Sequence, residues 1–288
     1  MILSVYFDIH KVFSQIPELS KKIPITLELA LVAMLISLVI GLLVAVIRVK
    51  RIPVLTQIAK FYVSIIRGTP MIVQLYIAYF GIPILLRSMN NNFGWDINIR
   101  IIPNIAYAFA ALGIYQSAYT SETIRAALQS VDKGEIEAAQ AMGMSYPQIL
   151  WHVIIPEALE IALPGLINSL IGLIKGTSLA FSCGVVEITA QAKIIGGRTY
   201  RYLEGYVALA IIYWIITIII EQILKLVERK ISIPEQVGEK KDGTIKTLIN
   251  KIKALFNKNK VVPLVESKTN ELVVEANFND SFDKDGDE

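Results

Sequence analysis

The feature that most constrains this chain is a series of long apolar blocks between residues 23 and 227. A helix needs about 20 mostly apolar residues to cross a bilayer. Five segments meet this requirement, at residues 23–47, 61–86, 102–121, 161–183 and 206–227. The sequence therefore predicts an all-α, polytopic membrane protein with five transmembrane helices.

The residue types present argue against several classes of chemistry. The 288 residues include one cysteine, Cys183, and two histidines, His10 and His152, too few for the usual zinc sites or for a disulfide. A phosphate loop of the form Gly-x-x-x-x-Gly-Lys-Ser/Thr is also absent from the sequence. We expect no catalytic residue, no metal, no cofactor and no nucleic-acid partner, and no hydrolysis of ATP by this chain.

The distribution of basic residues orients the spans. Lysine and arginine favour the cytoplasmic side, and the cluster of Arg48, Lys50 and Arg51 directly follows the first apolar block. This predicts an external N-terminal segment at residues 1–22, a transmembrane domain at 23–228 and a polar, flexible cytoplasmic tail at 229–288. We expect a multi-pass protein of the bacterial cytoplasmic membrane.

The longest loop between spans, at about residues 126–160, lies on the cytoplasmic side in this topology. Residues 135–142 are rich in alanine and glutamate, which favours a helix, and Gly143 provides a stop. Ser145 with Gln148 can form a capping box, and Pro147 fits a first turn. We expect two short helices joined by a glycine turn, the second ending at Pro156. Such a loop either docks onto another protein or lies on the membrane.

The spacing within this loop resembles a known family. Glu137-Ala138-Ala139 is followed after three residues by Gly143, and after nine more by an apolar triplet and Pro156. This pattern is similar to the signature loop of ABC-type importer permeases. The resemblance implies a coupling helix that inserts into a cytoplasmic ATP-binding subunit. The residues it assigns to coupling are Glu137, Ala138, Ala139, Gly143, Ser145, Pro147 and Pro156.

Two further motifs resemble the polar amino-acid branch of that family, which includes histidine, glutamine and cystine permeases. The second-span motif consists of Arg67, Gly68, Thr69, Pro70 and Gln74. The fourth-span motif is residues 175–179, although the branch usually has aspartate at the position of Gly176.

The resemblance implies a permease subunit of an ATP-driven amino-acid importer, with cystine slightly favoured as substrate. Its partners would be the ATP-binding subunit, an extracytoplasmic amino-acid-binding protein and the lipid bilayer. Five spans are too few to enclose a path, so a second permease copy or a paralogue is also expected. The alternative is a stand-alone secondary transporter or channel, which would normally show internal repeats.

Charged residues near the spans are candidates for the substrate path or a gate. Lys175 lies within the fourth apolar block, where an ammonium group is costly. Together with Thr177 and Ser178 it either contacts substrate or reaches toward an interface. Glu122 and Arg125 are three residues apart and can pair on one helical face, either as a fixed ion pair or as a gate. Glu187 and Arg198 either contact a delivery protein or are solvated.

Overall fold

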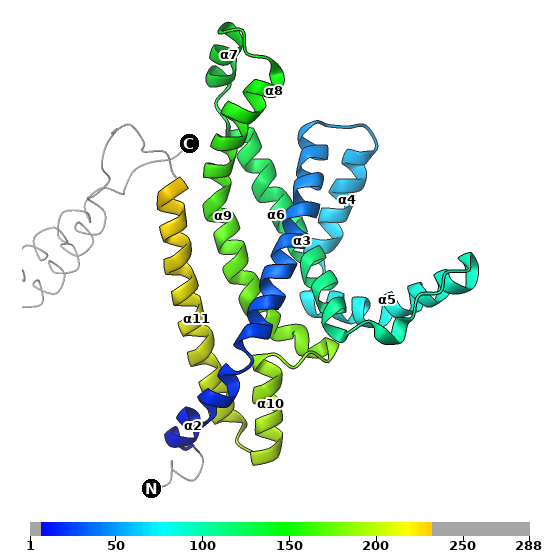
Figure 1. Cartoon of the computed structure of the whole chain (residues 1–288), viewed down its shortest axis with the longest axis vertical. Coiled ribbons are helices and arrows are strands. Elements are labelled where there is room, and N and C mark those ends of the chain that lie inside the picture. The colour runs from blue at the N-terminus through cyan, green and yellow to red at the C-terminus, as the bar shows by residue number, and fades with distance from the viewer. Residues whose placement is uncertain (1–6, 232–288) are drawn as a thin grey trace, which may run out of the picture. The chain divides into compact units, whose positions relative to one another are not determined.

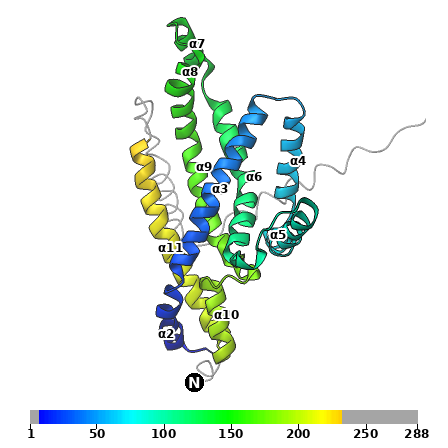
Figure 2. The same ribbon diagram turned by 45° about the vertical axis from the view of Figure 1, so that its right-hand side comes forward.

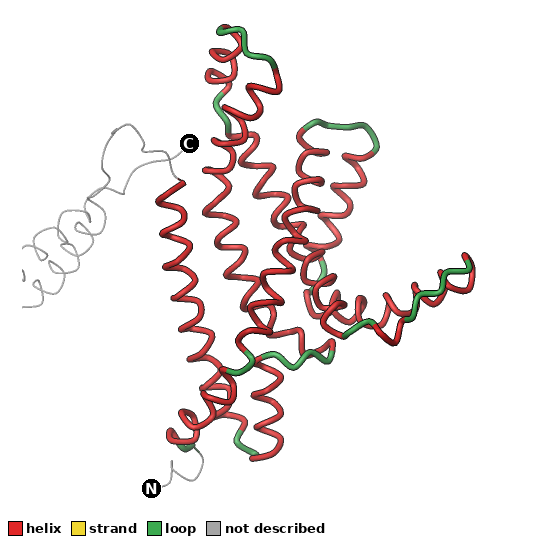
Figure 3. Tube along the Cα trace, viewed as in Figure 1, coloured by secondary structure: helices red, strands yellow, loops and turns green. Residues whose placement is uncertain are grey.

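The computed structural model describes residues 7–231, so residues 232–288 of the predicted tail lie outside it. Helices connected by loops make up this described part (Figure 3). The all-α class predicted from the sequence is confirmed.

Within residues 7–231, four helices are long and apolar enough to cross a membrane. They are α3 (Ile23–Val49), α5 (Met71–Phe93), the continuous helical segment Tyr146–Cys183 that includes α9 (Ile155–Gly176), and α11 (Tyr202–Ile231). The third predicted span corresponds to α6 (Asn104–Ser130), which is long enough to cross a membrane but more polar than these four helices. The total of five spans stays a prediction.

The predicted second span is wrong as a single helix. The structure divides it into α4 (Leu55–Gly68) and α5, with Thr69 and Pro70 in extended conformation between them. Proline disfavours the helical conformation of the residue before it and lacks an amide donor. In Figures 1 and 2, α4 lies beside α3 and α6, whereas α5 runs in a different direction from α4.

Helices α3 and α6 pack closely because small residues line their contact. A Cβ at Gly113 would lie 2.6 Å from Ile36 Cγ2, and one at Gly41 would lie 3.0 Å from Thr120 Cγ2. The hydroxyls of Ser37 and Thr120 are 3.3 Å apart within this contact. Small residues and hydroxyl pairs are the usual basis of helix association in membranes.

The N-terminal segment folds into a helix that the sequence reading did not predict. Helix α2 (Ile9–Ser20) begins after Asp8, whose carboxylate accepts a hydrogen bond from the His10 amide at 2.9 Å. Val12 and Leu19 are buried in a cluster that also contains residues of α10 (Ile188–Thr199) and α11. The lower part of Figure 1 shows α2 and α10 at the same end of the molecule.

The loop predicted to be cytoplasmic extends beyond the opposite end. It contains α7 (Lys133–Ala141), α8 (Tyr146–Ile149) and a π-helical turn at Leu150–Ile154 that leads directly into α9. Figures 1 and 2 show α7 and α8 past the end of α3, at the far end of α6 and α9. The remaining elements are two 3-10 segments, Ile99–Ile101 and Thr177–Cys183.

Candidate functional site: a helical hairpin and the ion pairs beneath it

The hairpin formed by α7 and α8 turns at Gly143, as the sequence predicts. Gly143 has φ +82°, a conformation that few residues other than glycine adopt readily. Its amide donates to Gln140 O at 2.9 Å, and the Met144 amide donates to Ala139 O at 3.1 Å. These two bonds are those of a Schellman motif, which closes the end of α7 in one fixed geometry.

Both helices of the hairpin have defined starts. The Asp132 carboxylate accepts from the Gly134 amide at 2.8 Å and caps α7. At α8, Gln148 Oε1 accepts from the Ser145 amide at 2.8 Å and from its hydroxyl at 2.9 Å. The predicted capping box of Ser145 and Gln148 is therefore present.

The predicted end of the second helix at Pro156 is wrong. The chain stays helical from Tyr146 through the π-helical turn into α9, and Pro156 lies in the first turn of α9. A proline is tolerated there because the first amides of a helix have no partner within it. The hairpin is thus joined to α9 by continuous helix.

The side chains predicted to take part in coupling differ in exposure. Glu137, Ala138, Gly143, Ser145, Pro147 and Pro156 are exposed, whereas Ala139 is buried. The sequence reading missed two large apolar side chains around the turn, Met142 and Tyr146, which are 76% and 61% exposed. Large apolar residues in a loop between spans are a signal that could have been used.

Carboxylates gather where the hairpin meets α9. Glu157 Oε1 accepts from the Asp132 amide at 3.3 Å, which links the start of α7 to the first turn of α9. The charge of Glu157 raises the pKa of Glu135, with smaller contributions from burial and Asp132. This contact fixes the base of the hairpin relative to the membrane helices.

Glu122 lies at the centre of an ion-pair cluster. It pairs with Arg125 at 2.8 Å, as the sequence predicts, and also with Arg48 of α3. Arg125 additionally donates to Gln129 Oε1 at 2.6 Å. The cluster connects α3 to α6 near the ends that face the hairpin, and the part played by Arg48, 74 positions away, has no signal in the local sequence.

The other predicted path residues lie elsewhere. Lys175 is exposed at the end of α9, Ser178 is half-buried, and Thr177 is buried with its hydroxyl donating to Ile174 O at 2.6 Å. Helix α9 meets α6 at Gly165, where an added Cβ would lie 2.7 Å from Thr123 Cγ2. Ten residues of helix place Lys175 about 15 Å further along α9. The structure therefore separates the Lys175 group from the Glu122 cluster.

The second-span motif stabilises the break between α4 and α5. Gln74 Nε2 donates to Ile66 O at 2.8 Å and to Thr69 Oγ1 at 2.6 Å. These bonds satisfy groups at the end of α4 that helix geometry leaves free. Gly68 and Pro70 flank the turn, and the guanidinium of Arg67 lies 5.4 Å from the centre of the Tyr119 ring.

Both interpretations of Glu187 are wrong, because the structure buries this side chain completely. Its carboxylate accepts from the amides of Thr189 at 2.7 Å and Ala190 at 2.8 Å, and from the Tyr213 hydroxyl at 3.2 Å. Burial raises the pKa of Glu187, although these hydrogen bonds oppose the shift. Glu187 caps α10 and holds it against α11.

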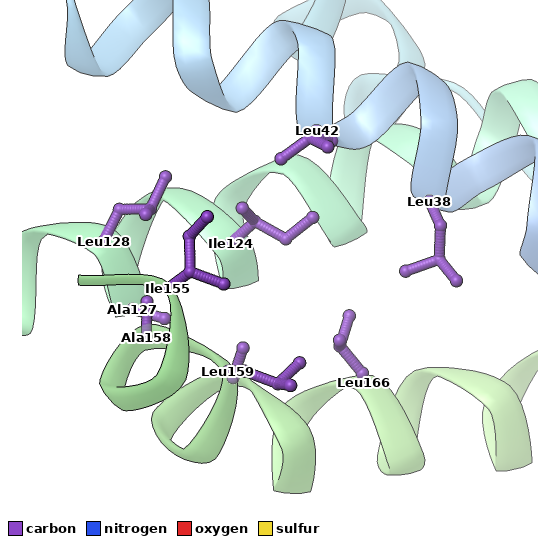
Figure 4. Close-up of a pocket in the computed structure, with 10 residues that line it drawn as sticks. Leu38, Leu42, Ile124, Ala127, Leu128, Ile155, Ala158, Leu159 and Leu166 are labelled. Carbon is purple, nitrogen blue, oxygen red and sulfur yellow. The ribbon is translucent and has the colours of Figure 1, made fainter. Parts of the chain in front are cut away.

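An apolar pocket of about 220 Å³ opens between α3, α6 and α9. Figure 4 shows Leu38 and Leu42 of α3 facing Ile124, Leu159 and Leu166 across the space. Every side chain that lines it is apolar. It offers no partner for the charged groups of an amino acid and is not a substrate site of the predicted kind.

Comparison with known proteins places this geometry in context. Residues 18–233 match the family described as binding-protein-dependent transport system inner membrane component. The chain is 40% identical to the probable amino-acid permease protein YxeN of Bacillus subtilis, over 77% of this chain and 94% of that protein. It is 36% identical to the L-cystine transport system permease protein TcyL of the same organism, over 78% of this chain and 92% of that protein.

A solved structure has a similar fold. The crystal structure of an amino acid ABC transporter with histidines superposes with a TM-score of 0.65 and 34% identity, and covers 78% of this chain and 99% of the matched chain.

Proposed function

Because the chain belongs to the family of binding-protein-dependent transport system inner membrane components, we propose that it is the membrane-spanning permease subunit of an ATP-driven amino-acid importer. The named functions of its relatives support the substrate class. Hydrolysis of ATP belongs to a separate cytoplasmic subunit. An extracytoplasmic binding protein delivers the substrate on the other side.

The observation that carries this proposal is the exposed hairpin of α7 and α8. Met142 and Tyr146 expose apolar surface at a turn that projects past the end of α3 (Figure 2). The Schellman motif at Gly143 holds the turn in one shape, so docking costs little conformational entropy. The continuous helix from Tyr146 into α9 supports a role in which motion of the hairpin reaches the membrane.

Co-purification tests the docking step. Replacing Met142 and Tyr146 with serine removes the apolar contact at the turn of the hairpin, and we expect the ATP-binding subunit to be lost from the purified complex. The matched control is Tyr200→Ser, since Tyr200 is exposed in the loop between α10 and α11. Retention of the ATPase by the double variant, or equal loss in the control, would contradict the proposal.

A second variant separates docking from coupling. Gly143→Val forces a β-branched residue into a positive φ, which distorts the turn while leaving the spans intact. We expect uptake in reconstituted vesicles to fall at least tenfold while the protein still inserts. Normal uptake by this variant would argue against a coupling role for the hairpin.

For the substrate path, we propose that Lys175 contacts the carboxylate of the amino acid. Its ammonium group is exposed in the single chain, and it lies in a segment of a membrane-spanning length where an uncompensated charge is costly. Lys175→Met keeps the apolar stem, so uptake should fall while assembly and basal ATP hydrolysis persist. A fully active Lys175→Met importer would exclude this contact.

The membrane helices of a single chain are too few to surround a translocation path. A second permease copy or a paralogue completes the path. Helix α5 supports this step, because only Leu75 of its 23 residues is buried. To test whether two copies meet at α5, a cysteine is introduced at Ile77 in the Cys183→Ser background and crosslinked. We expect a dimer-sized product. A product of monomer size would contradict this arrangement.

A further inference from the structure

A polar pocket of about 410 Å³ lies at the turn between α3 and α4, on the side predicted to be cytoplasmic. None of the residues assigned to coupling or to the substrate path lines it. It is lined by Arg48, Arg51, Ile52, Pro53, Val54, Thr56, Gln57 and Lys60.

The backbone of this turn is strained. Arg51 has φ +52° and Val54 has φ +64°, and they are two of the three non-glycine residues with positive φ in the described chain. A β-branched residue such as Val54 is a clear outlier in this region. Such strain is typically found at binding and switch sites.

Hydrogen bonds hold the turn in this conformation. The Ile52 amide donates to Ile47 O at 3.3 Å, and the Thr56 hydroxyl donates to Ile52 O at 2.8 Å. These bonds connect the end of α3 to the start of α4 and keep the two ends close. The pocket is thus preformed in the single chain.

The charge of the pocket is positive and only partly compensated. Arg48 is paired with Glu122. Arg51 and Lys60 are exposed, and within residues 7–231 neither takes part in an ion pair. Two cations of this kind at a bilayer surface attract anionic groups.

Apolar surface continues directly from the pocket along α4. Val54 is 70% exposed, and Leu55, Ile58 and Phe61 are also exposed. Positions 55, 58 and 61 follow one another at three-residue spacing and lie on one side of the helix, whereas Gln57 and Lys60 lie on another. Charged and apolar surface therefore meet along one helix.

We propose that this turn binds an anionic phospholipid, with the headgroup phosphate at Arg51 and Lys60 and an acyl chain along Val54, Ile58 and Phe61. The lipid satisfies both surfaces at once, which a free phosphate or an acidic protein segment does not. The site is independent of the transported substrate.

Native mass spectrometry of the full-length permease in neutral detergent tests the site. The probes are dioctanoyl phosphatidylglycerol, dioctanoyl phosphatidylcholine and inorganic phosphate. We expect the anionic lipid to bind at least tenfold more tightly than the zwitterionic one, and inorganic phosphate at millimolar concentration to compete poorly.

The variant combines Arg51→Gly with Lys60→Gln. Glycine adopts the positive φ at position 51 without strain, so we expect the turn to keep its conformation. Affinity for the anionic lipid should fall roughly tenfold or more, because each basic residue near an anionic surface contributes about 1 kcal/mol to binding. The matched control removes Arg87 and Arg100, two exposed arginines on the opposite side in the predicted topology, and should bind as the parent does.

Three results would overturn the proposal. The first is equal binding of the two lipids. The second is full competition by inorganic phosphate, which would identify a free-anion site. The third is crosslinking of Lys60 to a co-purified ATP-binding subunit together with unchanged lipid binding by the variant, which would assign the basic surface to a protein partner.

Discussion

Helices α5 and α6 pack against each other and are of similar length, yet they differ sharply in how they are buried. Eleven residues of α6 are buried, against one of α5. The buried residues of α6 include Gly113, Ser117 and Thr120, while α5 exposes apolar side chains such as Ile77 and Ile84. The more apolar helix is therefore the less buried one.

This contrast follows from the solvent around a membrane protein. Lipid tails are as apolar as leucine, so apolar residues gain little by moving from lipid into the protein. Close approach and hydroxyl contacts bring helices together, and α6 has both. The exposed face of α5 is not covered by the rest of the described chain.

The largest difference in unfolding free energy is expected between alanine substitutions of two leucines. Leu112 on α6 is fully buried, whereas Leu85 on α5 is 60% exposed. Leu112→Ala leaves a cavity and should lower the unfolding free energy by about 2–5 kcal/mol. Leu85→Ala should change it by less than about 0.5 kcal/mol. Unfolding in mixed micelles measures both, and similar losses would mean that α5 is packed within the single chain.

Two glycines test close approach. At Gly113 a Cβ would lie 2.6 Å from Ile36 Cγ2 and 2.8 Å from Ile36 Cβ, whereas at Gly81 the nearest atom is 3.9 Å away. Gly113→Ala should destabilise the protein by about 1–3 kcal/mol through overpacking. Gly81→Ala should be neutral or stabilising by up to about 1 kcal/mol, because alanine favours helix. The thermal unfolding midpoint should fall for Gly113→Ala and should stay the same or rise for Gly81→Ala.

The start of α5 is held by polar contacts. Gln74→Leu removes the bonds to Ile66 O and Thr69 Oγ1, and we expect a loss of about 1 kcal/mol. Proteolysis near Thr69 should become faster as the break loosens. Asn92→Leu, at an exposed residue bonded to Ser88 on the same helix, is the control and should leave the rate unchanged.

The smallest effect concerns hydroxyl contacts. Ser37→Ala removes the 3.3 Å contact with Thr120 between α3 and α6, and membrane hydrogen bonds of this kind average about 0.6 kcal/mol. Ser88→Ala on the exposed part of α5 should have no measurable effect. A larger loss for Ser88→Ala would show that α5 makes polar contacts absent from the single chain.

Sequence reasoning succeeded where the determining interactions are local. The Gly143 turn, the helices on either side of it and the Glu122–Arg125 pair all involve residues within a few positions of one another. The break at Pro70 could have been predicted on the same grounds, because a proline limits the residue before it. The prediction of one continuous span at residues 61–86 gave too much weight to apolar composition.

What the sequence by itself determined is therefore the helical class, three of the apolar spans and the turn of the hairpin, because hydropathy and turn chemistry depend on neighbouring residues. Three features were decided by the tertiary structure alone. Arg48 forms an ion pair with Glu122, Glu187 is buried against Tyr213, and α3 packs against α6. These depend on which helices approach closely. In a bilayer that choice is made by small residues and hydrogen bonds far apart in the chain, which apolar periodicity does not report.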